Sequence, residues 1–322
     1  MQPKDGIPKF LNDFLIYLTT IKGKSKRTRK EYRYDLSLFL KFIILIREDH
    51  DVSEISDITI CDLNIEFLKT ISLEEMYAFL EYCEEVRNNK DCSRSRKVAA
   101  IKSFFKYITN KKKYIDINPS IELESPKLAK KQPVYLNLEE SQLFLKSIQT
   151  GTHQYRDYCI MMIFLNCGLR ISELVNLNLS SLNEDILTVT GKGNKQRTLY
   201  LNASCLHVIE QYKEKERNRY VTEYNKDVLF LSQKRTRISA RTVQLIVGEI
   251  NEKSGLHKAH LTPHKLRHSA ATLLYKTCND IRKLQYILGH QNVSTTQIYT
   301  HLDNDEIRET MINNPLNVEP LK

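Results

Sequence analysis

The uneven distribution of glycine constrains the fold of this chain more than any other feature. Only Gly6 and Gly23 occur in the first 150 residues, and the other seven glycines come later. A long segment with so little glycine is typical of a helical bundle. Within it, apolar residues recur at helical spacing near residues 7–21, 25–43, 73–87 and 93–108. We therefore expect four amphipathic helices, the second starting at Ser25 and the fourth near Ser93.

The second and fourth of these helices are basic on their polar faces. Both begin on a serine with basic residues in the first turn, although helix N-termini normally favour acidic side chains. Phosphate groups of DNA would supply the missing negative charge. A solvated basic face is the ordinary alternative for any single charged helix. The residues that we expect to contact DNA are Arg27, Arg29, Arg94, Arg96, Lys97 and Lys102.

Prolines mark the boundary between two predicted domains. Pro119, Pro126 and Pro133 interrupt any helix within a stretch punctuated by lysines. We assign residues 1–115 to a helical domain, residues 116–133 to a linker and residues 134–322 to a second domain. In the first domain, the acidic, β-branched segment around residues 46–72 is interpreted as a surface insertion with short turns.

The second domain is predicted to combine helices with one small hairpin. Asn137 and Glu140 have the spacing of a capping box and begin its first helix. An apolar helix ends near Gly168, another begins at about residue 171, and two alternating strands flank the turn GKGNK. The strand residues expected to face inward are Leu187, Val189, Leu199 and Leu201. Further helices are expected at residues 203–219, 240–253, 263–275, 280–288 and 294–301. The predicted fold class is mainly α with a small β-hairpin.

Charge and cysteine content narrow the functional classes. Lys and Arg total 49 against 39 acidic residues, and the net charge of +10 favours a polyanionic partner, most often nucleic acid. The seven cysteines are odd in number and lack a C-x-x-C pair, which argues against a disulfide framework and a zinc ribbon. Cys159 and Cys167 are expected to be buried free thiols. Because the sequence shows neither a signal peptide nor a membrane-spanning run, we expect a cytoplasmic, nucleoid-associated protein with no membrane partner.

Three motifs carry cationic side chains suited to an anion. His264 and Arg267 lie three residues apart in the first turn of a predicted helix. Arg170 follows the stretch NCGL at a helix junction, and Lys192 lies in the glycine-flanked hairpin turn. Each has an ordinary alternative, namely a surface pair, an ion pair between Arg170 and Glu173, and an exposed turn lysine. The P-loop ending Gly-Lys-Ser/Thr is absent, so ATP binding is not expected.

Taken together, these side chains match the requirements of metal-free phosphoryl transfer. Arg170 and Arg267 can hold the phosphodiester and its developing charge. Lys192 can protonate the leaving 5′ oxygen. Tyr299, in the stretch LGHQNVSTTQIYTH, can serve as the nucleophile, although a buried core tyrosine is the ordinary alternative. The candidates for the base or hydrogen-bond partner of its phenol are His264 and His290. No cofactor or metal is expected.

The same motifs resemble those of a known family. The stretches GLRISELVNL, GKGNKQRTLYL, HKLRHSAATLL and LGHQNVSTTQIYTH are similar, in order and spacing, to the catalytic boxes of tyrosine recombinases, the lambda integrase family. The stretches RTRKEYRYDLSLFLKF, RSRKVAAIKSFFKYI and NPSIELESPK resemble the helical core-binding domain of that family. The likeness covers nearly the whole chain and is closest to the Xer-like branch. The segment around residues 46–72 is longer than in compact members.

The resemblance implies a role for each candidate catalytic residue. Tyr299 would be the nucleophile, the two arginines the phosphate clamp, and Lys192 the general acid. His264 would act as a general acid/base and His290 as a phosphate ligand. The implied fold is a C-shaped, two-domain clamp on duplex DNA.

The resemblance also implies partners and an outcome. The expected substrate is double-stranded DNA with inverted half-sites, cut and rejoined through a 3′-phosphotyrosine intermediate and a Holliday junction. The C-terminal tail would join four subunits into a tetramer on DNA. A second recombinase or an activator protein is a further partner that the resemblance allows. Chromosome dimer resolution and mobile-element integration or excision both fit. The alternatives are type IB topoisomerase-like DNA relaxation and a catalytically silent DNA-binding protein.

Overall fold

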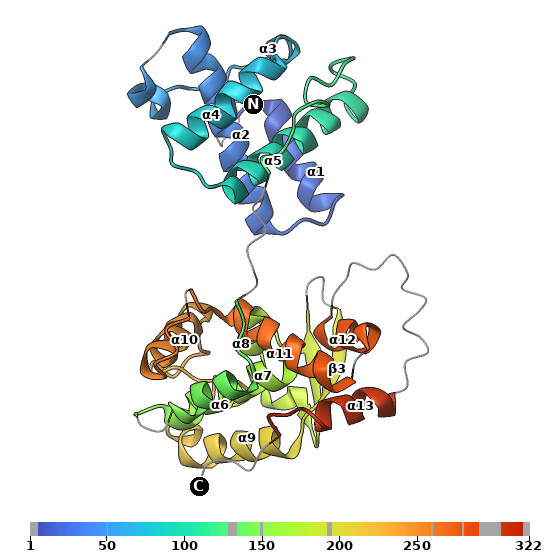
Figure 1. The fold of residues 1–322 in the computed structure, drawn as a ribbon. Helices are drawn as coiled ribbons and strands as arrows, with labels where there is room; N and C mark the ends of the chain where they lie inside the picture. Colours follow the sequence, from blue (N-terminus) through green and yellow to red (C-terminus); the bar gives the residue numbers. More distant parts are fainter. Residues whose placement is uncertain are drawn as a thin grey trace. The chain divides into compact units, whose positions relative to one another are not determined.

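The computed structural model divides into two compact units, Met1–Lys131 and Gln132–Lys322 (Figure 1). The structure describes residues 6–49, 51–127, 134–148, 151–191, 195–258, 260–278, 280–289 and 304–317. Among these residues, no helix has the length and apolar character needed to cross a membrane.

The first unit is a helical bundle, as the glycine distribution indicated. Its elements are α1 (Lys9–Thr20), α2 (Lys26–Arg47), a short 3₁₀ helix (Val52–Ser56), α3 (Ile65–Lys69), α4 (Leu73–Glu85) and α5 (Asp91–Asn110). The predicted apolar faces meet in one core, where Phe14, Phe39, Phe79 and Phe105 are fully buried. The hydroxyl of Ser25 accepts a hydrogen bond from the backbone N–H of Thr28, which confirms the predicted cap of α2.

Two expectations for this unit are wrong. Ser93 does not begin the fourth helix, because α5 starts at Asp91 and Lys90 holds the cap position without a side-chain bond. The carboxylate of Asp91 lies in the first turn, where it complements the helix dipole. The segment around residues 46–72 is more than a surface insertion, since Ile60 and Leu68 are buried in the core.

The first part of the predicted linker packs on the first unit. Leu123 is buried in the same core as the helices, and Ser120 is also buried. The ammonium of Lys102 donates hydrogen bonds to the backbone carbonyls of Ile121 and Leu123, at 3.0 and 2.8 Å. The chain therefore stays attached to α5 beyond residue 115.

The second unit is built around one apolar helix, α7 (Gln154–Cys167), which is buried in its core. Its other helices are α6 (Leu138–Lys146), α8 (Ile171–Val175), α9 (Ala203–Lys215), α10 (Ala240–Lys253), α11 (Pro263–Cys278), α12 (Ile281–Leu288) and α13 (Asn304–Ile312). The capping box between Asn137 and Glu140 is present at the start of α6. Along α7 the run from Cys159 to Cys167 is buried, and these two cysteines are free thiols, as predicted.

A small antiparallel sheet borders the unit. The predicted hairpin consists of β2 (Ile186–Thr190) and β3 (Gln196–Tyr200), and a short strand that the sequence did not suggest, β1 (Leu182–Asn183), extends it. The register places Val189 opposite Arg197. The four apolar strand residues expected to face inward are buried: Leu187, Val189, Leu199 and Leu201.

The C-terminal segment packs on its own unit. Figure 1 shows α13 next to β3, and contacts between the two elements agree with this view. Ile307, Met311 and Leu316 are buried in the core of the unit. Arg308 donates a hydrogen bond to the carboxylate of Asp185 at 2.6 Å. These contacts fix residues 307–317 to the subunit that contains them.

Candidate active site

The structure describes three of the six predicted catalytic residues. Arg170 is the N-cap residue of α8, and His264 and Arg267 lie in the first turns of α11. Lys192, His290 and Tyr299 lie outside the described residues. Their immediate neighbours Gly191 and Gly289 are described, however, and both lie close to the arginines of the site.

Gly168 makes the junction between α7 and α8 possible. Its φ of +57° ends α7 in the left-handed region that favours glycine. A Cβ atom at this position would also lie 2.7 Å from a methyl carbon of Leu288. The glycine thus turns the chain tightly and lets the end of α12 approach, which brings Arg170 to the end of α12.

Arg170 is held on one side and open on the other. One guanidinium nitrogen donates to Glu173 Oε1 at 2.8 Å, and the other donates to the backbone carbonyl of Gly289 at 2.8 Å. The backbone N–H of Arg170 donates to Glu173 Oε2, also at 2.8 Å. The side chain remains 37% exposed. The ordinary ion pair with Glu173 is therefore present, and it leaves Arg170 partly free to contact an anion.

Arg267 is buried against the same helix end. Its guanidinium donates to the carbonyls of Gly168 and Leu288, at 2.7 and 2.6 Å. Burial, with the nearby charge of Arg170, lowers the pKa of Arg267 to about 10. Arg267 therefore stays protonated near neutral pH. His264, three residues earlier, is exposed at the start of α11, so the two residues have different environments.

Glu173 and Arg197 complete the network, and Arg197 was missed by the sequence analysis. The two carboxylate oxygens of Glu173 accept hydrogen bonds from the two terminal nitrogens of Arg197, both at 2.9 Å. Burial would raise the pKa of Glu173, but the hydrogen bonds from Arg197 and Arg170 outweigh it and lower the pKa to about 2. Glu173 is therefore an anion at neutral pH, surrounded by arginines.

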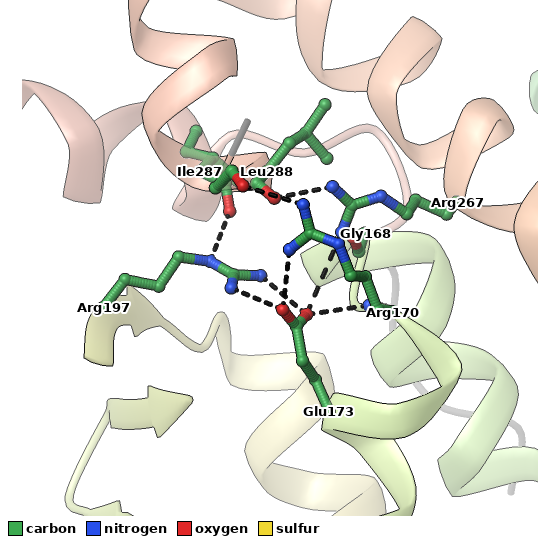
Figure 2. A network of polar contacts seen from close by, with 8 residues as sticks. Gly168, Arg170, Glu173, Arg197, Arg267, Ile287 and Leu288 are labelled. Carbon is green, nitrogen blue, oxygen red and sulfur yellow. Dashed lines mark hydrogen bonds and ion pairs between the residues drawn. The ribbon is translucent and has the colours of Figure 1, made fainter. Parts of the chain in front are cut away.

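Three arginines bind the last carbonyls of α12 (Figure 2). Arg197 donates to Ile287, Arg267 donates to Leu288, and Arg170 donates to Gly289. Carbonyls at a helix C-terminus lack partners within the helix and carry partial negative charge. The arginines donate hydrogen bonds to these carbonyls and complement their partial negative charge. Glu173 is the anion that the three arginines share, so the cluster keeps a net positive charge. Such a cluster suits a phosphate group.

In the first unit, most of the basic residues expected to contact DNA already have protein partners. Arg94 pairs with Glu84 and Asp91. Arg96 and Lys97 both pair with Asp35, and Lys97 is buried. Lys102 binds the backbone carbonyls described above. Arg27 is exposed and Arg29 is half-exposed at the start of α2.

Comparisons with known proteins agree with this architecture. Residues 135–306 match the model of the phage integrase family, and residues 11–112 match the phage integrase N-terminal SAM-like domain. The chain is 47% identical to tyrosine recombinase XerC of Caldanaerobacter subterraneus subsp. tengcongensis, over 97% of this chain and 88% of that protein. It is 32% identical to XerC of Oceanobacillus iheyensis, over 93% of both chains.

Two solved structures share the fold at lower identity. A XerH site-specific recombinase bound to a palindromic difH substrate has a TM-score of 0.64 and 23% identity, over 96% of this chain and 97% of that one. A lambda integrase tetramer bound to a Holliday junction has a TM-score of 0.63 and 17% identity, over 90% of this chain and 79% of that one.

Proposed function

This chain belongs to the phage integrase family and is a tyrosine recombinase, and from that premise we propose that it cuts and rejoins duplex DNA through a 3′-phosphotyrosine intermediate and a Holliday junction. The observation that supports this chemistry best is the cluster of Arg170, Arg267 and Glu173 at the end of α12. It provides fixed positive charge immediately before the segment that contains His290 and Tyr299.

In the proposed reaction, the phenol oxygen of Tyr299 attacks the phosphorus of one strand. A 3′-phosphotyrosyl bond forms and the bond to the 5′ oxygen breaks, with Lys192 donating the proton that this oxygen takes up. Arg170 and Arg267 stabilise the charge that develops on the phosphate oxygens. His264 exchanges a proton with the attacking phenol, and His290 binds the phosphate. Because the phosphotyrosine conserves the energy of the phosphodiester, rejoining needs no ATP.

The proposed substrate is duplex DNA with two inverted half-sites, one bound by each protomer. The net charge of +10 favours such a polyanion. Among the six basic residues expected to contact DNA, Arg27 and Arg29 lie at the accessible start of α2 and fit this role best. The others would need to exchange their protein partners for phosphate.

We also propose that the C-terminal tail joins subunits into a tetramer on DNA. In the structure residues 307–317 pack on their own unit through Ile307, Met311 and Leu316, so joining a neighbour requires the tail to leave this position. Removing residues 306–322 should weaken assembly on two half-sites more than the binding of a single half-site, which the loss of three core side chains also affects. Mobility-shift titrations on one and two half-sites would measure both. Unchanged assembly would rule out the tail as the connector.

The test of the function as a whole is covalent capture in cells. Cells expressing the protein are lysed in detergent, DNA still attached to protein is recovered, and its ends are sequenced. We expect enrichment at a few discrete inverted-repeat sites, which would also distinguish a chromosomal site from the ends of a mobile element. Capture scattered over the genome would favour topoisomerase activity instead. Absence of capture with intact DNA binding would contradict the proposed chemistry.

A further inference from the structure

Arg197 is not among the residues to which the proposed reaction assigns a role. Each of its three guanidinium nitrogens donates a hydrogen bond to protein: Nη1 and Nη2 to the carboxylate of Glu173, and Nε to the carbonyl of Ile287 at 3.0 Å. The side chain is only 10% exposed. Arg197 therefore acts through its protein neighbours rather than by touching DNA.

Those neighbours adjoin Arg170 and two described glycines, Gly191 and Gly289, which precede Lys192 and His290 in the sequence. Glu173 accepts hydrogen bonds from Arg170 as well as from Arg197. A Cβ atom on Gly289, the residue before His290, would lie 3.0–3.2 Å from the guanidinium and Cδ of Arg197. The guanidinium thus packs directly against the backbone that leads to His290.

The hairpin turn lies against the same pair of side chains. A Cβ atom on Gly191, the residue before Lys192, would lie 3.4 Å from Glu173 Oε1 and 4.0 Å from Arg197 Nη1. The backbone N–H of Gly191 donates to the carbonyl of Lys195 at 2.8 Å, which closes the turn. The pair of Glu173 and Arg197 therefore borders the start of the turn that carries Lys192.

From this junction we infer that Arg197 is a positioning residue: it fixes the clamp arginine Arg170, the backbone at Gly191 before Lys192 and the backbone at Gly289 before His290 relative to one another. The inference rests on the proposed function. Catalysis by several fixed groups depends steeply on their geometry, and a misplacement of about 1 Å can cost about 100-fold in rate. The planar fork of arginine is needed, because the single ammonium of lysine cannot make both bonds to Glu173 and the bond to Ile287.

The test separates cleavage rate from DNA affinity. Single-turnover cleavage of a nicked half-site substrate, which traps the covalent complex, is measured for the wild type, Arg197→Lys and Arg197→Ala below their melting temperatures. We expect cleavage to fall about 100-fold in Arg197→Ala and to be only partly restored by lysine, since charge alone does not replace the geometry. The Kd for the half-site should stay close to that of the wild type. Amides of residues 285–289 should exchange faster with solvent in the alanine variant.

Arg237 provides the matched control. It also binds backbone carbonyls, those of Val175 and Leu177 at 2.9 and 3.0 Å, but at the other end of α8. Arg237→Ala should lower the melting temperature while the cleavage rate stays near that of the wild type. The inference is overturned if Arg197→Ala cleaves at the wild-type rate, or if both alanine variants lose rate in proportion to their loss of melting temperature. The wild type is measured in the same assay. If it cleaves DNA, the proposed function stands even when the result for Arg197 overturns this inference.

Discussion

Replacing Tyr299 with phenylalanine is expected to abolish covalent capture of DNA while leaving the affinity for DNA unchanged. The substitution removes only the phenol oxygen, which the proposed reaction uses as its nucleophile. Detergent-resistant complexes on a half-site substrate measure capture, and a mobility-shift titration measures affinity. A covalent complex formed by Tyr299→Phe would show that another residue is the nucleophile.

A second tyrosine controls for the loss of a hydroxyl group as such. Tyr275 lies on α11 in the same unit and is exposed. Tyr275→Phe should form covalent complexes at the wild-type rate, because its hydroxyl has no part in the proposed chemistry. If both variants lost capture, the effect would arise from the fold of the unit and not from a missing nucleophile.

Local rules were sufficient for several helix ends of this chain and for part of its site. The cap at Ser25, the capping box of Asn137 and Glu140 and the glycine end of α7 are all set by residues within a few positions of one another. The ion pair between Arg170 and Glu173 has the same local origin. Such features can be predicted from sequence because the interacting groups share one turn of chain.

The remainder of the site depends on contacts between distant parts of the chain. Arg170 binds Gly289 and Arg267 binds Gly168, so each bond joins residues about a hundred positions apart. No spacing rule reveals that three arginines meet at the end of α12. A signal for Arg197 did exist in the sequence. It lies two residues before Leu199 on β3, so the two side chains share the inward face of the strand. An arginine on that face indicates a buried anion.

The same reasoning explains the placement of Lys97. It is four residues before Ile101 and therefore shares the inward face of α5, where it pairs with the buried carboxylate of Asp35. A lysine at this position is expected to be buried and paired rather than available to DNA. The prediction that Lys97 lies on the polar face of α5 was therefore wrong, because its spacing to Ile101 places it on the inward face.

Replacing Glu173 with glutamine is expected to reduce both cleavage and stability. The side chain is 1% exposed and is the shared anion of Arg170 and Arg197. Glutamine keeps the shape but removes the charge, so the arginines lose the group that orients them. We expect cleavage to fall by about 10³-fold, the loss typical when electrostatic groups of an active site are disturbed. Breaking a buried ion pair should also lower the free energy of unfolding by about 3 kcal/mol.

Glu140 provides the comparison for Glu173→Gln. Like Glu173, it is the third residue of its helix and takes part in a capping box. It pairs with Lys258 at 2.6 Å, but it lies on α6. Glu140→Gln should lose a little stability and keep its cleavage rate. Equal losses of cleavage in the two variants would mean that Glu173 contributes to the fold and not to the orientation of the clamp.

The pH dependence of stability tests the charge on Glu173 directly. Its pKa in the folded protein is about 2, below the ordinary 4.5, because hydrogen bonds from Arg197 and Arg170 outweigh the effect of burial. A lowered pKa gives stability that is complete above about pH 4.5 and is lost as the pH falls towards 2. The free energy of unfolding, measured with urea, should therefore depend less on pH in Glu173→Gln than in the wild type between about pH 4.5 and pH 2. If the free energy of unfolding depended on pH equally in the two proteins, an ionised, arginine-bound Glu173 would be contradicted.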